Sequence, residues 1–337
     1  MTAPSARRTL IRIPLTVALF AIVLFAVDQL VPGAGRRLAH ANFGWLALAF
    51  GFELLACAAY VVLFQAVMSR LPWLVRLRRG IEISLSEIGG FAITPTGIGG
   101  PAIRVWALRS GGMPWRVLIV RSISHGAIFN VPYVAAAIVL GVGVSLHILP
   151  GHAPVLTALA PLSLVLATCA LAGGAVWFAR TERFRDRPGV LARVRWVVTT
   201  IPEGIIDIGT VARRPGALLG ATGWWAGDCA ALWAAFQAVG GRPALSVLIL
   251  AYMLGQLGNT LPLPGGVGGV EPLMLGIFAT SGVNLGLAGA AIICYRTIAL
   301  GVQGGLGALA FVSLASGLSA ERRRAVALRP AEALGSE

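Results

Sequence analysis

Residues 260–271, TLPLPGGVGGVE, interrupt a long apolar part of the chain. Pro262 and Pro264 each lack a backbone donor and clash with the preceding turn, and four glycines add backbone freedom, so a regular helix does not continue here. The flanking apolar segments, residues 244–259 and 272–281, are each too short to cross a hydrocarbon core of about 30 Å alone. The pattern therefore predicts a re-entrant hairpin that enters a membrane, breaks, and leaves on the same side. The alternative is a kink packed between helices.

The composition of the chain indicates a polytopic membrane protein. Of its 337 residues, 57% are hydrophobic and 12% are charged, and the mean hydropathy is +0.83, which no soluble domain approaches. The 27 cationic residues are all Arg, and with 13 acidic residues they give a net charge of +14. Because these arginines cluster in loops between apolar segments, as in cytoplasmic loops, we expect no nucleic-acid partner.

The apolar segments predict an all-α polytopic integral membrane protein with about six full spans and two re-entrant hairpins. Residues 245–281 form the hairpin around the break quoted above. A second break, TPTGIGGP at residues 94–101, lies within the other hairpin, residues 81–108. Residues 190–211 have the pattern of an amphipathic, interfacial helix. The full spans are expected at residues 11–31, 44–68, 117–142, 154–179, 217–239 and 285–314.

These elements occur twice in the same order. Residues 11–150 and residues 154–318 both contain a span, a span, a hairpin and a span, and the second half begins on the opposite side of the membrane. This is the signature of inverted-topology repeats. Glu53 and Asp228, which are 175 residues apart, occupy corresponding positions in the two halves. We therefore predict a single transmembrane domain, residues 11–320, made of two inverted halves.

The arginines also predict the orientation of the chain. They flank the first and last spans and fill residues 180–214, whereas residues 143–153 carry no Arg and no acid. By the positive-inside rule, both termini and residues 180–214 face the cytoplasm, and residues 143–153 face the outside of the cell (inner or plasma) membrane. Residues 321–337 are expected to form a basic, then flexible cytoplasmic tail.

Two arginines are expected deep inside long spans. Arg121 and Arg296 are again 175 residues apart. A central Arg costs about 2.5 to 3.5 kcal/mol even on the mildest insertion scale, so such a residue normally faces a cavity and pairs with an acid. Both are therefore candidate substrate-binding residues, with a structural ion pair or snorkelling to the interface as the alternative. The supporting acids available at depth are Glu53, Glu87, Asp228 and Glu271.

The tips of the two hairpins supply a second element of the expected site. A half-helix that begins after a glycine run offers unpaired N–H groups and a positive dipole end. Such ends are expected at Gly99, Gly100, Gly268 and Gly269. Because the hairpins enter from opposite sides, Gly99 and Gly268 should approach each other across a shared polar cavity. With the arginines, these groups would bind a phosphate or carboxylate near the midplane, and Asn259 would add hydrogen bonds.

Both breaks resemble the motifs of a known family. The residues LPLPGGVGGVE match the P-G-G-x-G-x-x-E signature of the lysylphosphatidylglycerol synthase transmembrane region, a flippase-like domain family, and TPTGIGGPAIR resembles its first-half motif. The resemblance covers residues 11–318 and implies that Arg104 and Glu271 belong to the site, whereas Arg104 taken alone is equally a cytoplasmic loop charge. At Pro101 the chain departs from the family, many members of which have an acid there. This departure weakens the case for an acid–Arg pair in the first tip.

The resemblance implies a membrane domain that translocates lipids between leaflets. Some members of the family carry aminoacylated phosphatidylglycerol, and others are linked to polyprenyl-phosphate or hopanoid pathways. No soluble aminoacyltransferase domain follows the membrane region in these 337 residues, so we do not expect this chain alone to synthesise an aminoacyl lipid. The expected function is that of a flippase or transporter for a lipid with a phosphate-containing head group.

Two other functions are considered, a membrane-embedded lipid-modifying enzyme and a non-transporting partner of a glycolipid or polyprenyl-phosphate pathway. The sequence has no Ser/His/Asp spacing, HExxH or Asp-rich metal motif, so we expect no enzymatic activity, no cofactor and no metal. The expected partners are membrane lipids. Enzymes of lipid or cell-envelope synthesis and a second copy of the chain are further candidates.

Overall fold

The computed structural model describes residues 34–95, 97–150 and 190–334, together with short pieces between residues 163 and 177. These residues form α-helices joined by loops, with no β-strand among them. The span expected at residues 11–31 lies outside this part of the chain, and more than half of the span expected at residues 154–179 lies outside it.

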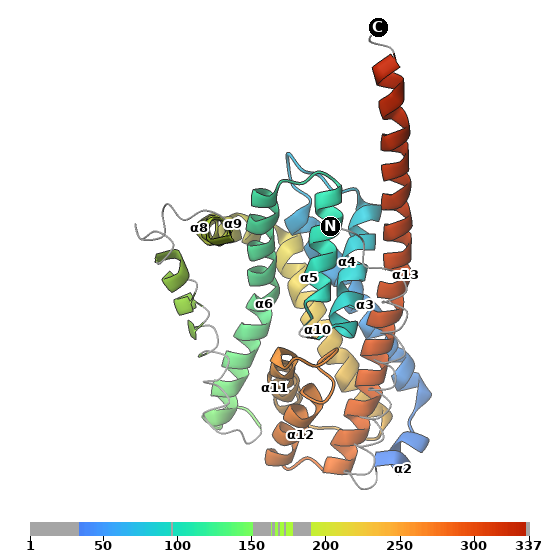
Figure 1. The fold of residues 1–337 in the computed structure, drawn as a ribbon. Coiled ribbons are helices and arrows are strands. Elements are labelled where there is room, and N and C mark those ends of the chain that lie inside the picture. Colours follow the sequence, from blue (N-terminus) through green and yellow to red (C-terminus); the bar gives the residue numbers. More distant parts are fainter. Residues whose placement is uncertain are drawn as a thin grey trace.

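The described helices follow one another through the two halves of the chain (Figure 1). Short loops join most of them, and η2, a 3-10 turn, continues directly from α11. In chain order they are α2 (Ala34–Ala39), α3 (Phe43–Met68), α4 (Leu77–Ile93), α5 (Gly99–Ser110), α6 (Trp115–Ser145), α8 (Val190–Thr199), α9 (Ile201–Ala212), α10 (Pro215–Ala238), α11 (Leu245–Gly255), η2 (Gln256–Thr260), α12 (Val270–Thr280) and α13 (Leu285–Leu334).

Three of these helices are long and apolar enough to cross a membrane, namely α3, α6 and Leu285–Glu321 of α13. They confirm the spans expected at residues 44–68, 117–142 and 285–314. The chain is therefore an all-α, multi-pass membrane protein. Beyond its membrane-length part, α13 continues as a helix to Leu334, through most of the segment that the sequence predicted to be a flexible tail (Figure 1).

The span expected at residues 217–239 corresponds to α10, which differs from the other three in composition. Its 24 residues are long enough to cross, but the helix is rich in Gly, Ala and Trp, contains Asp228, and does not reach the hydropathy of a membrane span. Its surroundings explain this composition, because α10 packs against α3, α6 and α13 and buries most of its side chains. A helix that is covered by protein has no need of a lipid-like surface.

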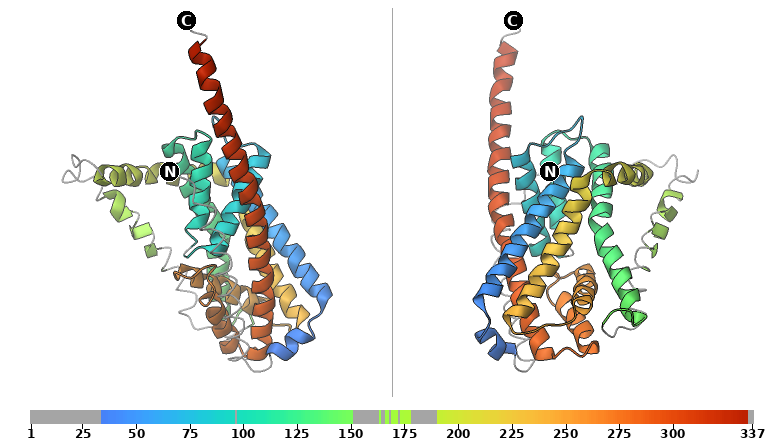
Figure 2. Two further views of the ribbon diagram at one scale, coloured as in Figure 1. Left: turned by 45° about the vertical axis from the view of Figure 1, so that its right-hand side comes forward. Right: turned by 180° about the vertical axis from the view of Figure 1, so that it is seen from behind.

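The packing of α10 on α3 depends on small residues. The two helices run antiparallel and lie side by side along their lengths (Figure 2). A Cβ added to Gly220 would lie 2.5 Å from the backbone nitrogen of Leu63, and one added to Gly227 would lie 3.0 Å from the Cβ of Ala56. The glycines therefore let the two backbones approach closely, as small residues do between membrane helices.

The helix pairs α4–α5 and α11–α12 reverse direction at the two predicted breaks. The first pair enters from the end of the bundle where α3 finishes, and the second enters from the opposite end (Figure 1). Glycines make the turns, with Gly265 at a φ of 59°, which L side chains rarely adopt. The two tips touch through an isolated antiparallel bridge between Pro95 and Pro264. The recorded contact between the tips therefore involves these prolines, and the approach of Gly99 and Gly268 across a shared cavity stays a prediction.

The order of elements seen in α3, α4–α5 and α6 recurs in α10, α11–α12 and α13, and each member of the second set runs in the opposite direction to its counterpart (Figures 1 and 2). The predicted interfacial segment at residues 190–211 is helical, but it is divided at Thr200 into α8 and α9. These two helices extend sideways from the bundle, beside the end where α6 and α10 begin (Figure 2). Among the described residues, the arginines of the loops after α3 and before α10, Arg70, Arg76, Arg213 and Arg214, lie at this same end.

Candidate functional site

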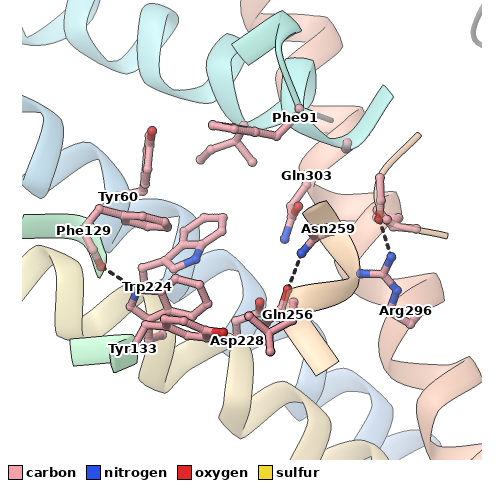
Figure 3. Close-up of a pocket in the computed structure, with 18 of the residues that line it drawn as sticks. Tyr60, Phe91, Phe129, Tyr133, Trp224, Asp228, Gln256, Asn259, Arg296 and Gln303 are labelled. Atoms are coloured by element: carbon pink, nitrogen blue, oxygen red, sulfur yellow. Dashed lines mark hydrogen bonds between the residues drawn. The ribbon is translucent and has the colours of Figure 1, made fainter. Parts of the chain in front are cut away.

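A cavity of about 320 Å³ lies inside the bundle beside the two touching tips (Figure 3). Its lining residues come from α3, α4, α6, α10 and α13 and from the loop between α11 and α12. The residues that α6 and α10 contribute, among them Asn130 and Asp228, lie near the midpoints of these helices. The cavity is therefore about equally far from both ends of the bundle.

One side of the cavity is an aromatic wall, formed by Tyr60, Phe129, Tyr133, Trp224 and Trp225. The ring centroids of Tyr133 and Trp225 are 4.9 Å apart, and those of Phe129 and Trp225 are 5.0 Å apart. The indole Nε1 of Trp225 donates a 2.7 Å hydrogen bond to the backbone oxygen of Phe129, which satisfies its only donor and fixes the ring. The wall is thus a rigid and largely apolar surface.

The side of the cavity facing this wall is polar and is centred on Arg296 of α13 (Figure 3). The Arg296 side chain is buried, its Nε donates to Glu271 Oε1 at 2.7 Å, and its Nη2 donates to the backbone oxygen of Gly265. Among the residues that the structure describes, its remaining nitrogen, Nη1, has no hydrogen-bond partner. Asn259 lies on the same side and donates to Gln256 Oε1 at 2.6 Å. Three of the predicted site residues, Arg296, Glu271 and Asn259, therefore meet here.

Glu271 holds the second tip in place. Its Oε1 accepts from Arg296, and its Oε2 accepts a 2.7 Å hydrogen bond from the backbone nitrogen of Gly268, three residues earlier. The carboxylate lies in the first turn of α12, where the positive end of the helix dipole also favours a negative charge. One side chain therefore connects the tip loop, the start of α12 and the first third of α13.

The glycine N–H groups that were predicted to bind an anion are already occupied. Gly268 donates to Glu271, Gly99 donates to a threonine hydroxyl at 2.9 Å, and Gly100 and Gly269 donate to backbone carbonyls of their own turns. None of these four glycines lines the cavity. In this conformation, Arg296 and not the N–H groups offers a donor to an anion.

Arg104, the predicted site residue of the first tip, belongs to a buried cluster outside the cavity lining. Its Nη1 lies 2.9 Å from Glu87 Oε1 and 3.0 Å from His125 Nδ1. His125 in turn packs edge-on against Tyr60 of the aromatic wall, with ring centroids 5.4 Å apart. Although Pro101 replaces the acid that many family members have there, an acid–Arg pair still forms, because Glu87 of α4 supplies the carboxylate.

Arg121 does not lie in the cavity. Its guanidinium donates to backbone carbonyls at the end of α3 and in the loop that follows, those of Met68, Arg70 and Trp73. These carbonyls have no partner within α3, so the Arg side chain satisfies the end of that helix. The structure thus separates Arg121 from Arg296, although the sequence predicted equivalent positions and a common role for them.

Glu53 of α3 and Asp228 of α10 approach each other in the centre of the bundle, and Asp228 lines the cavity. Gln303 Nε2 donates to Glu53 Oε1 at 2.7 Å, and the Tyr252 hydroxyl donates to Asp228 Oδ2 at 2.7 Å. The sequence predicted both acids but missed their two partners and the aromatic wall. Gln303 had a signal of its own, since an amide within an apolar span requires a polar partner.

Ion pairs also join α9 to the rest of the bundle at its arginine-rich end. Arg70 donates to both oxygens of Asp207, at 2.8 and 2.7 Å, and Ser124 donates to the same carboxylate at 2.6 Å. Burial opposes ionisation of Asp207, but these hydrogen bonds outweigh it and hold the pKa of the carboxyl below its ordinary value. Similarly, hydrogen bonds from Arg116 lower the pKa of the exposed carboxyl of Glu203.

Comparison with known proteins gives two matches. The model of a family described as the lysylphosphatidylglycerol synthase TM region matches residues 11–307, which confirms the resemblance carried by the two breaks. The chain is also 24% identical over 309 residues to a protein of Methanothermobacter thermautotrophicus described as a UPF0104 membrane protein, covering 82% of this chain and 85% of that relative.

Proposed function

The chain belongs to the lysylphosphatidylglycerol synthase TM region family, and from this premise and the geometry of the cavity we propose that it moves a lipid with a phosphate-containing head group between the leaflets of the membrane. The observation that carries the proposal is Arg296, a buried guanidinium that lines the cavity and whose Nη1 has no hydrogen-bond partner among the described residues. It lies eleven residues into α13, about 16 Å from the start of the helix. A guanidinium at that depth offers a positive charge and a planar set of N–H donors, which suit the oxygens of a phosphate.

The size of the cavity suits a head group and not a whole lipid. About 320 Å³ is near the lower end of the range for small-molecule pockets, about 300 to 1,000 Å³. In the proposed bound state, a phosphate oxygen accepts from Arg296 Nη1, Asn259 and Gln256 bind neutral polar groups, and the aromatic wall excludes water. The acyl chains remain in the bilayer.

We further propose that α4–α5 and α11–α12 are re-entrant hairpins of two inverted-topology repeats. Each helix of these pairs is too short to cross a bilayer alone, except for a marginal α4, and the pairs enter from opposite ends and touch at their tips. Transport then takes place by rocking of one repeat against the other around the fixed cavity. Under the positive-inside rule, the arginine-rich end of the bundle, with both termini, faces the cytoplasm of a cell membrane.

This proposal describes a carrier without enzymatic activity. A lipid-modifying enzyme and a non-transporting partner of a lipid or cell-envelope pathway are the alternatives, and both would use the same cavity to hold a lipid. The three functions differ in what happens to lipid in contact with the purified protein. A carrier moves it unchanged, an enzyme alters its head group, and a partner protein does neither.

The test uses the full chain in phosphatidylcholine vesicles that contain a trace of phosphatidylglycerol with a fluorescent acyl chain. Dithionite bleaches the label in the outer leaflet, so loss of the protected inner fraction reports movement, and chromatography of the recovered lipid reports modification. The decisive variant is Glu271→Gln/Arg296→Gln, which removes both members of a buried ion pair and leaves neither partner of that pair charged.

The matched control is Arg70→Gln/Asp207→Asn, which removes an ion pair of the same length outside the cavity. We expect the parent and this control to move labelled lipid and the Glu271→Gln/Arg296→Gln variant to fold without moving it. Equal movement by all three proteins would show that Arg296 only holds the bundle together, and altered lipid would favour the enzyme.

A further inference from the structure

The contact between Glu53 and Asp228, here called the carboxyl pair, has an unusual hydrogen-bond pattern. Both side chains are more than nine-tenths buried, at 0% and 4% exposed. One oxygen of each accepts a hydrogen bond, from Gln303 and from Tyr252. The other oxygens, Glu53 Oε2 and Asp228 Oδ1, have no hydrogen-bond partner in the described part of the chain, although the close packing of α10 on α3 brings the two carboxyls near each other.

A proton bound to one of the two carboxyls would give both of these buried oxygens a hydrogen-bond partner. Two ionised carboxylates cannot hydrogen-bond to each other, and in a dry interior their repulsion prevents both from being charged. If one of them carries a proton, the same two oxygens become a donor and an acceptor, and no buried oxygen is left unpaired. Gln303 and Tyr252, which can both donate, then stabilise the single negative charge that remains.

The surrounding charges favour the same assignment. The titratable groups that face the carboxyl pair are Cys57, Cys229, Tyr252, Tyr295 and Arg296, from α3, α10, α11 and α13. Arg296 is the single cation among them, and its Nε is already paired with Glu271. The cluster thus holds three carboxyl groups against one guanidinium, so a proton on the carboxyl pair reduces an excess of buried negative charge.

We infer that Glu53 and Asp228 form a proton-binding site, in which one proton shared between Glu53 Oε2 and Asp228 Oδ1 is taken up and released through the cavity that Asp228 lines. The site joins α3 and α10, the two closely packed and oppositely directed helices of the two halves. Release of the proton leaves two negative charges facing each other across this helix contact. The proton is therefore a ligand whose loss favours separation of the halves.

Two measurements on the full chain in detergent test the proton site. Infrared spectroscopy at neutral pH should show the carbonyl stretch of a protonated carboxylic acid, which fades as the pH is raised. The band should be absent from Glu53→Gln and from Asp228→Asn, because an amide replaces one of the two carboxyls that share the proton. It should persist in Glu82→Gln, whose parent carboxylate pairs with Arg78 and Arg79 outside the cavity. A parent without the band, or a band that survives both substitutions, would overturn the inference.

The second measurement needs no variant and therefore does not depend on how the variants fold. Dicyclohexylcarbodiimide modifies protonated carboxyls in apolar surroundings, and mass spectrometry locates the adduct. At neutral pH we expect it on Glu53 or Asp228, with several-fold less at high pH. Modification of neither residue would overturn the inference even if the substituted proteins misfold.

The coupling of this proton to lipid movement rests on the proposed function and is tested separately. In the vesicle assay, exchange of one proton per lipid predicts that a gradient of one pH unit shifts the distribution of labelled phosphatidylglycerol about tenfold. In Glu53→Gln, whatever lipid movement remains should show no response to the gradient. If the parent moves lipid without any response to the pH gradient, the coupling of the proton to lipid movement is wrong, but the proton site itself is not affected. No movement by the parent would overturn the proposed function, while the infrared and carbodiimide results would still decide the proton site.

Discussion

Glu271→Gln should destabilise the protein more than Arg296→Gln, although the two residues are partners in one ion pair. Removing one member of a fully buried pair costs about 3 to 5 kcal/mol, because it leaves the other charge uncompensated. After Glu271→Gln, the Arg296 guanidinium retains one hydrogen bond, to the backbone oxygen of Gly265. After Arg296→Gln, the Glu271 carboxylate keeps the N–H of Gly268 and the positive end of α12. A helix terminus stabilises a partly buried charge by up to about 2 kcal/mol. Arg296→Gln should therefore be less destabilised than Glu271→Gln by about that amount.

The assay for this prediction is a double-mutant cycle on the free energy of unfolding in mild detergent, with Glu271→Gln, Arg296→Gln and the double variant. The double variant removes both charges of the ion pair together, so its loss of stability should be clearly smaller than the sum of the two single losses. Additive losses, or a greater loss for Arg296→Gln, would refute the reasoning. In that case, the ion pair would not be what connects the second tip to α13.

Three further perturbations test the bundle, its charges and its orientation. Gly220→Leu should lower the melting temperature sharply, because its Cβ would lie 2.5 Å from the backbone nitrogen of Leu63; an unchanged value would contradict the close packing of α3 and α10. The folded-state pKa of Asp207 is lowered, so its ionised form stabilises the fold above the unfolded pKa of about 3.9, and this stability is lost as the pH falls through the folded pKa. Asp207→Asn should therefore melt below the parent at pH 7, and the difference should shrink below about pH 4; a difference that persists in acid would contradict the ion pair. Ile148→Cys should react with an impermeant thiol reagent in intact cells and Arg213→Cys only after lysis, whereas the reverse pattern would invert the orientation.

The sequence predicts the breaks well because proline and glycine act locally. Pro262 and Pro264 prevent a helix regardless of what packs around them, and the structure shows the break between the end of α11 at Gly255 and the start of α12 at Val270. The long spans are predicted for a similar reason, since lipid imposes one composition on any helix surface that faces it. α10 is the exception, because its neighbours cover it and its composition reflects contact with protein.

The site was only partly predictable. The pairing of Glu271 with Arg296 follows from burial, because a charge at depth requires a partner. The occupation of the Gly268 N–H could also have been foreseen, since a Glu in the first turn of a helix often reaches back to an N–H three residues earlier, as in a capping box. The role of Arg121 could not have been foreseen, because its partners are backbone carbonyls that carry no signal in the sequence. The aromatic wall likewise combines side chains from α3, α6 and α10 that only the fold brings together.

The central claim is that the cavity accepts the phosphate of a lipid at Arg296, and site-specific photo-crosslinking tests it most directly. A benzophenone amino acid would replace either Asn259, which lines the cavity, or Leu309, which lies on the same helix as Arg296 and is 73% exposed. Each protein would be irradiated in vesicles that contain ³²P-labelled phosphatidylglycerol. We predict a labelled adduct at both positions, of which only the one at position 259 disappears when Glu271→Gln/Arg296→Gln is added. An adduct at position 259 that persists in this background, or no adduct there beside a strong one at position 309, would contradict the account.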